Sequence, residues 1–433
     1  MDSDLRSARV HSFRPGAATL VPLLVLASFG SLLAGLPPGG RWVMGSLGLG
    51  AGISAVALMG AAAVLAARWP WVESLFGGLD RVYEAHKWLG VWALVFASVH
   101  LVLQSGHQGW EVAPIVQLPR AATRMVRQLS FVAVMVIVLL ALNRNIPYRV
   151  WRWWHKLSGP LFLVVVLHWL SFRSPIALAS PAGLWLAAIS ALAVLAAAYK
   201  LLLYPLLSRH AEYRLESVSS NDTAVYLQFV PTGRAIPFVA GQFAFVAFKH
   251  EGLREPHPYT IASAAGAGGR IAFMVRSLGD YTSRLVAQVQ PGFLADVYAP
   301  FGRFNRRPDG RTEIWIAGGV GITPFLAWLQ DDAPAPPVPV VLFDFTTPGR
   351  ELPGAIDLPA LAQARGVELM EVTTGPATPA FRERFAAIVA QAGPGGVQVN
   401  VCGPKGLLDA VRALMREHGV DERNLRHELF AFR

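Results

Sequence analysis

Long apolar runs alternate with short polar segments over the first half of the chain, up to about residue 206. A helix that spans a bilayer needs roughly 20 mostly apolar residues. Runs that meet this requirement lie at residues 17–36, 43–67, 82–103, 125–142, 153–172 and 182–204. The pattern therefore predicts an all-α membrane domain of six helices.

The second half is patterned as a soluble protein, and its periodicity changes once along the way. Strands of a small antiparallel barrel are predicted first, because Val, Phe and Tyr alternate with polar residues at 213–219, 223–230 and 242–248. Strands then alternate with helices, which predicts a parallel α/β domain. The strands are expected at residues 313–317, 338–345, 367–373 and 397–401, and the helices at 358–364, 381–391 and 405–418.

These patterns predict three domains: a six-helix membrane domain at residues 1–206, a β-barrel at 207–308 and an α/β domain at 309–433. Composition agrees, since 53% of residues are hydrophobic and only 15% are charged, against about 25% charged in soluble domains. The net charge of +10 does not indicate nucleic-acid binding, because many Lys and Arg residues lie between the apolar spans. The one cysteine, Cys402, excludes an intramolecular disulfide.

Loop charges predict the orientation of the membrane domain. If the N-terminus is cytoplasmic, most Lys and Arg residues of this half lie on the inner side. The outer side then holds only Arg41, Arg120, Arg124, Arg127 and Arg173. An even number of spans also returns the soluble half to the cytoplasm.

Two of the predicted spans carry two histidines each, although polar residues inside a membrane are costly. The third span contains His86 and His100, and the fifth contains His155 and His168. Both spans run from the inner to the outer side, which predicts two cross-helix pairs about 20 Å apart in depth. Two haems, each held by two imidazoles, suit this arrangement. Isolated histidines that make interhelical hydrogen bonds are the alternative.

The two spacings do not fit a straight helix equally well. A step of 14 residues returns to within about 40° of the same face, whereas the step of 13 from His155 to His168 misses it by about 140°. Pro160 lies between these two histidines and is expected to kink or rewind the helix.

The two histidine-bearing segments resemble the ferric reductase and NADPH oxidase transmembrane superfamily. The likeness rests on His86-Lys87-Trp88-Leu89-Gly90 with His100, and on His155-Lys156-Leu157 with His168. The resemblance implies an inner haem b on His86 and His155 and an outer haem b on His100 and His168. It also implies a multi-pass protein of the bacterial inner membrane with its dehydrogenase domains in the cytoplasm.

Two motifs in the barrel region indicate a flavin site. A tyrosine ring that can stack and a threonine hydroxyl that can hydrogen-bond lie in His257-Pro258-Tyr259-Thr260-Ile261-Ala262-Ser263. Arg276 then ends a strand, and a helix opens at Asp280 or Gly279, with Thr282 in its first turn. Such a helix start with an arginine nearby is an anion site fit for a pyrophosphate. An ordinary strand and an ordinary capped helix are the alternative.

Together, in this order, the two motifs resemble the FAD domain of the ferredoxin–NADP reductase superfamily. His257 stands where the soluble reductases usually have arginine. A histidine at this position is typical of the transmembrane oxidases and ferric reductases. The turn Ala299-Pro300-Phe301-Gly302 is similar to the family's Gly-Pro-Tyr-Gly turn.

A glycine loop follows the first strand of the α/β domain and opens a helix. Glycines allow close backbone approach to phosphate, and the loop comprises Gly318, Gly319 and Gly321 before Thr323 and Pro324. The last strand before the final helix ends in Cys402, Gly403 and Pro404, at the edge where ligands of such sheets bind. The superfamily resemblance implies that Cys402 lies beside the nicotinamide, and a buried structural cysteine is the alternative.

Family members often finish with an aromatic residue that covers the flavin ring, and Phe430 and Phe432 are both candidates here. NADPH is favoured as the donor because Thr346, Thr347 and Arg350 follow the second strand, with NADH as the alternative.

The resemblance implies electron transfer from cytosolic NAD(P)H through FAD and two haems to an outer acceptor, either dioxygen or a ferric chelate. An electron-transfer module that serves a periplasmic protein or the quinone pool is a second hypothesis. A flavin reductase anchored by haem-free helices is a third, against which the four histidines argue. Membrane lipid and a small-molecule acceptor are the expected partners, and the oligomeric state stays open.

Overall fold

The computed structural model divides the chain into two compact units, residues 1–207 and 208–433, each described by itself. It describes residues 15–36, 44–103, 110–143, 145–146, 148–266, 268–331, 338–349, 353 and 356–428.

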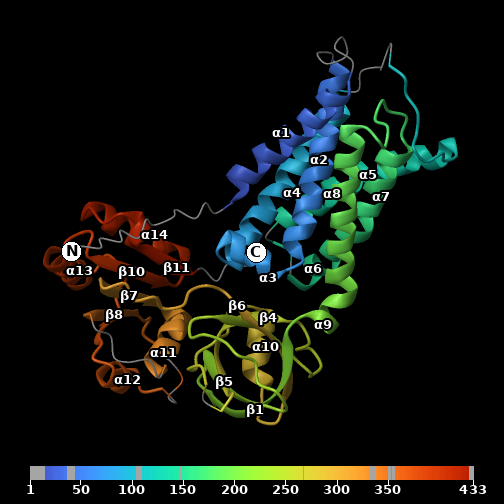
Figure 1. Ribbon diagram of the computed structural model, residues 1–433. Helices are drawn as coiled ribbons and strands as arrows, with labels where there is room; N and C mark the ends of the chain where they lie inside the picture. The colour runs from blue at the N-terminus through green and yellow to red at the C-terminus, as the bar shows by residue number, and fades with distance from the viewer. Residues whose placement is uncertain are drawn as a thin grey trace, which may run out of the picture. The chain divides into compact units, whose positions relative to one another are not determined.

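The regular elements described in the first unit are helices (Figure 1), and one isolated bridge joins Ala113 and Ser174 between them. Five of its helical segments are long and apolar enough to cross a membrane, which confirms the first four predicted spans and the sixth. The helices are α1 (Ala17–Gly35), α2 (Met44–Ala66), α3 (Pro70–Phe76), α4 (Leu79–Val102), α5 (Arg120–Leu142), α6 (Tyr148–Lys156), α7 (Ser158–Ser171), α8 (Pro181–Ala198), the π-helical turn η2 (Tyr199–Leu203) and α9 (Tyr204–Leu207).

The fifth predicted span, residues 153–172, is not one continuous helix, and the expected kink near Pro160 is confirmed. The structure interrupts it at Leu157, between α6 and α7. Pro160 explains the break, because it has no N–H to donate to the carbonyl of Lys156 and its ring would clash with that carbonyl. At the break, the N–H of Leu157 donates a hydrogen bond to the carbonyl of Trp154, three residues earlier, at 3.0 Å.

Two smaller features were outside the predicted pattern. The short helix α3 begins at a proline and ends at Gly77, whose φ of +81° is the left-handed conformation that glycine adopts readily. Helix α5 begins at Arg120 instead of residue 125, because arginines in its first turns hide the helical start from a hydropathy pattern.

Helix α2 is the central helix of the membrane unit, and most of its residues are buried. Its glycines allow close approach of its neighbours: a Cβ at Gly50 would lie 2.3 Å from the ring of Phe29, and one at Gly60 2.5 Å from Ile189. Small residues serve this purpose in membrane helices, whose association depends on packing. Large apolar side chains such as Leu195 are exposed on the outside, as expected of a lipid-facing surface.

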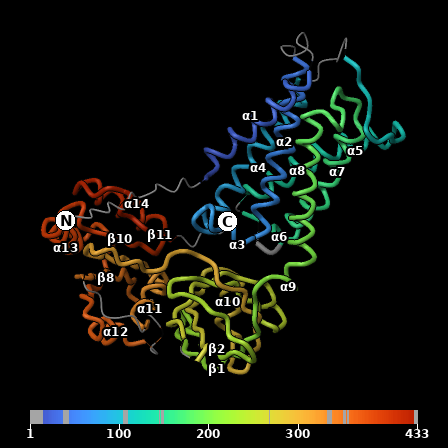
Figure 2. Tube along the Cα trace, in the orientation of Figure 1, coloured from blue at the N-terminus to red at the C-terminus, as the bar shows by residue number. Residues whose placement is uncertain are grey.

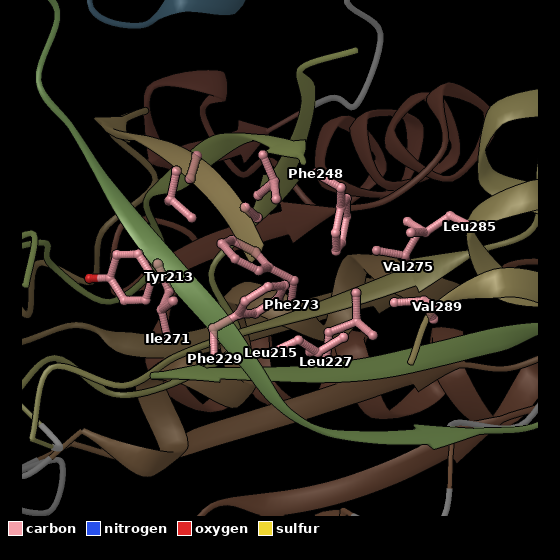
Figure 3. Packing of buried hydrophobic residues seen from close by; sticks show 14 of the residues in the cluster. Tyr213, Leu215, Leu227, Phe229, Phe248, Ile271, Phe273, Val275, Leu285 and Val289 are labelled. Atoms are coloured by element: carbon pink, nitrogen blue, oxygen red, sulfur yellow. The ribbon is translucent and has the colours of Figure 1, made fainter. Parts of the chain in front are cut away.

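The second unit begins with a six-stranded antiparallel sheet in the order β4-β3-β6-β1-β2-β5. A bridge between Ile261 and Phe273 links its two edges, so the sheet curls into a near-barrel with a core of apolar side chains (Figure 3). The elements are β1 (His210–Ser220), β2 (Ala224–Pro231), β3 (Phe243–Phe248), β4 (His257–Thr260), β5 (Ile271–Arg276), α10 (Asp280–Gln288) and β6 (Leu294–Phe301).

A five-stranded parallel sheet follows, in the order β11-β10-β7-β8-β9. Its elements are β7 (Thr312–Gly318), the 3-10 turn η3 (Gly319–Ile322), α11 (Thr323–Gln330), β8 (Val340–Phe345), α12 (Leu358–Ala364), β9 (Glu368–Val372), α13 (Pro379–Ala392), β10 (Val397–Cys402), α14 (Lys405–Glu417), the 3-10 turn η4 (Glu422–Asn424) and β11 (Leu425–Glu428).

Alternation along β7 explains the layers of this domain. Trp315 and Ala317 pack with α11 and α12, whereas Ile314 and Ile316 pack with α13 and α14 on the other face. Figure 2 shows the trace of these four helices. The strand order reverses between β7 and β10, and ligands of open α/β sheets bind at such a point. The predicted fold class of helical membrane domain, antiparallel barrel and α/β domain is confirmed.

Candidate functional site

The four membrane histidines form the two predicted cross-helix pairs. The ring centroids of His86 and His155 are 5.8 Å apart, and those of His100 and His168 are 6.4 Å apart. In both pairs the ring planes are 80° apart. The break between α6 and α7 allows this arrangement, because a continuous helix would turn His155 and His168 to different faces.

The two histidines of α4 contact backbone carbonyls of α2. Nδ1 of His86 lies 2.8 Å from the carbonyl oxygen of Ala62, and Nδ1 of His100 lies 2.7 Å from that of Gly48. A carbonyl oxygen only accepts, so each Nδ1 must carry the proton that it donates. In the neutral imidazole Nε2 then has the free lone pair.

The partner histidines are held by aromatic rings. His155 stacks on Trp151 at 5.1 Å, and His168 on Phe172 at 5.6 Å. Nδ1 of His155 is buried and has no hydrogen-bond partner among the described residues. This half of each pair is therefore oriented by packing.

Strand β4 carries the first flavin motif along one edge of the barrel sheet. His257 pairs with Val246, Pro258 with Phe245 and Thr260 with Phe243 in register with β3. The ring of His257 stacks on Tyr281 of α10 at 3.7 Å, so the predicted ring motif and the predicted anion-binding helix lie together.

Two hydroxyls of this motif are buried without a hydrogen-bond partner in the described part of the chain, those of Tyr259 and Thr260. Burial raises the pKa of Tyr259 well above its usual value, and the charge of Tyr281 adds to the effect. The hydroxyl therefore stays protonated and able to donate. Ser263 differs, because its hydroxyl already accepts from the backbone N–H of Ala272 at 3.1 Å.

Helix α10 begins at Asp280 with Gly279 as its N-cap, as predicted. The hydroxyl of Thr282 accepts from the N–H groups of Leu278 and Gly279 at 2.9 and 3.0 Å. The N–H groups of the first helical turn, from Asp280 onward, lack intrahelical acceptors, so this helix start is suited to bind an anion.

Arg276 lies where β5 meets the glycine loop of the α/β domain. A Cβ at Gly319 would stand 2.9 Å from its Nη1. The guanidinium also lowers the pKa of Asp344, opposing the effect of burial. Arg276 thus joins the two halves of the soluble unit, a placement that sequence reasoning did not predict.

The glycine loop packs directly against the end of β10. A Cβ at Gly321 would lie 2.1 Å from the carbonyl oxygen of Cys402, and one at Gly318 would lie 2.9 Å from Pro404. Gly319 has a φ of +57°. A Cβ added to Gly403 would lie 3.2 Å from the Cα of Gly318. No larger residue fits this junction, which the sequence predicted as the nucleotide edge.

The first turn of α11 completes the loop. The hydroxyl of Thr323 donates to the carbonyl of Val320 at 2.5 Å, and Pro324 occupies an early helical position, where a missing N–H has no cost.

Glu428 is a candidate that sequence reasoning missed. It pairs with Cys402 in register across β10 and β11, and a Cβ at Gly302 would lie 3.2 Å from its Oε1. Burial, and then the charge of Glu428, raise the pKa of Cys402 well above its usual value. The only sequence signal was one acidic residue near the predicted aromatic pair. Phe430 and Phe432 lie outside the described residues, as does Arg350.

Comparison with protein families gives two matches along the chain. Residues 51–166 match the family described as "Ferric reductase like transmembrane component", and residues 213–297 match "FAD-binding domain". The first match contains His86, His100 and His155, and the second contains the β4 motif.

Several curated proteins are similar to parts of the chain. Dual oxidase 2 of Sus scrofa is 24% identical over 302 residues, which is 58% of this chain and 18% of the relative. Methane monooxygenase component C of Methylosinus trichosporium is 30% identical over 156 residues, 34% of this chain and 45% of the relative. The matches thus span less than half the length of these relatives.

Solved structures align with about half of the chain. A ferredoxin NADP+ reductase from Neisseria gonorrhoeae with bound FAD and NADP is 20% identical, with a TM-score of 0.42, over 52% of this chain and all of the other. The ferredoxin reductase in carbazole 1,9a-dioxygenase is 18% identical, with a TM-score of 0.43, over 52% of this chain and 70% of the other.

A helical unit with five candidate membrane spans thus precedes a unit that contains an FAD-binding domain. The chain has the domain architecture of the ferric reductase and NADPH oxidase family, a ferric-reductase-like transmembrane component followed by an FAD-binding domain. The predicted order of a transmembrane domain followed by an FAD-binding domain agrees with these two matches.

Proposed function

We propose that the protein transfers electrons from NADPH, or NADH, through FAD and two b-type haems to a small-molecule acceptor across the membrane. The two histidine pairs, one above the other, carry this proposal. The proposed setting is the bacterial inner membrane, with the soluble unit in the cytoplasm. FAD would accept hydride and release single electrons, and the haems would carry those electrons onward.

The histidine pairs fit a metal held between two imidazoles. Metal–nitrogen bonds of about 2 Å, as in zinc sites, place the two ring centroids roughly 6 Å apart, and the observed separations are 5.8 and 6.4 Å. The carbonyl contacts of His86 and His100 leave Nε2 available. Metal-binding histidines commonly donate their other ring N–H in this way. His86 and His155 would hold the inner haem, and His100 and His168 the outer haem.

The barrel edge fits a flavin. The buried hydroxyls of Tyr259 and Thr260 have no partner among the described residues, so a bound ring would satisfy polar groups that are otherwise costly to bury. The first turn of α10 and the guanidinium of Arg276 supply the charge for a pyrophosphate. His257 and Pro258 would shape the edge of the site.

The junction of β7 and β10 fits a nicotinamide nucleotide. The glycine loop, with Thr323 and Pro324 at the following helix, would receive the phosphates. Cys402, Gly403 and Pro404 would form the wall beside the reacting ring. Because its pKa is raised, Cys402 would present a neutral thiol there, beside Glu428. Whichever of Phe430 and Phe432 reaches the flavin would cover its other face.

Absorbance spectroscopy tests the proposal. The purified protein in detergent should bind two haems and one FAD per chain, and NADPH should produce the reduced b-type haem bands under anaerobic conditions. A preparation that is yellow from flavin but has no haem bands would contradict the proposal.

The acceptor is tested on the same preparation. Dioxygen is tested first because of the likeness to an oxidase, with superoxide-dismutase-sensitive reduction of cytochrome c as the readout. Reduction of a ferric chelate is measured next, in the absence of oxygen. Haems that are reduced by NADPH but reoxidised only by a quinone or a periplasmic fraction would favour the electron-transfer module.

A further inference from the structure

Helix α2 contacts both histidines of α4 at matching positions. Gly48 and Ala62 are 14 residues apart on α2, and His100 and His86 are 14 residues apart on α4. The helices run antiparallel, so one carbonyl meets one imidazole at each level, at 2.7 and 2.8 Å.

These contacts use the free lone pairs of helix carbonyls. A carbonyl oxygen has two lone pairs, and the helix itself uses one of them. The second can be reached only where the side chains are small, and the two positions are glycine and alanine. A Cβ at Gly48 would lie 2.4 Å from the carbonyl oxygen of Leu103, so the close approach of the two helices requires glycine here.

Gly52 makes room for the imidazole of His100. It lies one turn along α2 from Gly48, and a Cβ at this position would stand 2.8 Å from Nδ1 and 3.1 Å from Cε1 of that ring. A methyl group would therefore push the ring away from the carbonyl of Gly48. Gly52 thus has a steric reason to be glycine that is separate from general helix packing.

We propose that α2 is a positioning helix for the haem ligands of α4. Through the carbonyls of Gly48 and Ala62 it sets the tautomer and orientation of His100 and His86, and Gly52 keeps the outer contact in place. Because it assumes that these histidines bind haem, the inference rests on the proposed function. The partner histidines are oriented instead by Trp151 and Phe172, so each haem would have one ligand of each kind.

The substitution Gly52→Ala tests the inference at the outer level alone. A hydrogen bond from Nδ1 strengthens the imidazole as a ligand and favours oxidised iron. Its loss should therefore raise the midpoint potential of one haem and alter its EPR signal, or release that haem. The other haem should keep its potential and signal. Redox titration and EPR of the purified full chain provide these readouts without an activity assay.

Two glycines serve as controls. Gly60→Ala inserts a methyl group 2.5 Å from Ile189 in the same helix, away from both histidines. Gly90→Ala lies on α4, where no atom stands within 4 Å of the new Cβ. Both variants should keep two haems with wild-type potentials.

The results separate the inference from the proposed function. Two unchanged haems in Gly52→Ala would overturn the inference, as would the same shift in Gly60→Ala. If Gly52→Ala does not fold, pulsed EPR of the wild-type protein decides, because the quadrupole coupling of the remote ring nitrogen reports hydrogen bonding of Nδ1. Four equivalent ligands without such a bond would overturn the inference. A wild-type protein without haem would refute the proposed function itself.

Discussion

At the scale of single residues, a buried carboxyl makes the stability of the soluble unit depend on pH. Asp344 near the end of β8 is only 3% exposed, and its Oδ1 has no hydrogen-bond partner among the described residues. Burial, and then the charge of Glu371, raise the pKa of Asp344 to about 7, while Arg276 opposes the rise. This carboxyl lies beside the nucleotide edge but belongs to no motif.

The raised pKa predicts how stability depends on pH. The ordinary pKa of 3.8 applies to the unfolded chain, so between about pH 4 and 7 folding takes up a proton at Asp344. The stability that this proton confers is complete below pH 4 and is lost as the pH rises to about 7, with an upper limit of ~4 kcal/mol. Asp344→Asn should therefore raise the melting temperature at pH 8 and change it little at pH 4.5.

The release temperature of FAD, followed by fluorescence without nucleotide, measures this effect. Asp222→Asn, at an exposed position, serves as the control and should leave the melting temperature unchanged at both pH 8 and pH 4.5. Equal melting curves of Asp344→Asn and wild type at pH 8 would show that burial of the ionised Asp344 does not lower the stability of the fold.

At the scale of elements, the break between α6 and α7 permits both histidine pairs. Helix α4 is continuous over the 14-residue step from His86 to His100, and this step nearly preserves the helix face. The 13-residue step from His155 to His168 does not, so an interruption is needed between them. Pro160 supplies it at a position where the N–H is absent.

Removal of this proline should damage the proposed haem sites. In Pro160→Ala the helix can run on through Leu157, which rotates His155 away from His86 or His168 away from His100. The expected result is a lower haem content per flavin, by up to half, measured by absorbance of the purified protein. Pro22→Ala, in α1 and without a histidine partner, should keep the wild-type ratio. An unchanged ratio in Pro160→Ala would show that the break does not depend on the proline.

At the scale of the whole molecule, the two units would carry the two parts of the proposed function, flavin reduction and electron transfer across the membrane. The barrel and the α/β domain share apolar contacts, since Tyr226 and Met274 of the barrel pack in one cluster with Phe325 and Trp328 of α11. The membrane unit has its own core around Phe162 and Val165. Flavin reduction and electron transfer across the membrane can therefore fail independently.

His100→Leu should uncouple the two activities. Reduction of FAD by NADPH should continue at the wild-type rate in stopped-flow absorbance, because the soluble unit is unchanged. The variant should lose one haem, and delivery to the outer acceptor should fall to background. His107→Leu, which replaces a histidine outside the two membrane pairs, should behave as wild type. Normal outward transfer in His100→Leu would refute this ligand assignment.

Sequence patterns alone were enough to predict the order of the domains, five of the six spans and the two histidine levels. These features follow from local signals: the length of an apolar run, the period of a strand, and a motif whose residues are neighbours in the chain. The start of α10 at Asp280 was predictable for the same reason, since the capping residues lie within one turn.

Contacts between residues far apart in the sequence became evident from the folded chain alone. The contact of Gly52 with His100, the place of Glu428 beside Cys402, and the reach of Arg276 to Gly319 all join residues far apart in the sequence. Each depends on how two elements pack, and packing is a property of the folded chain that no local pattern contains.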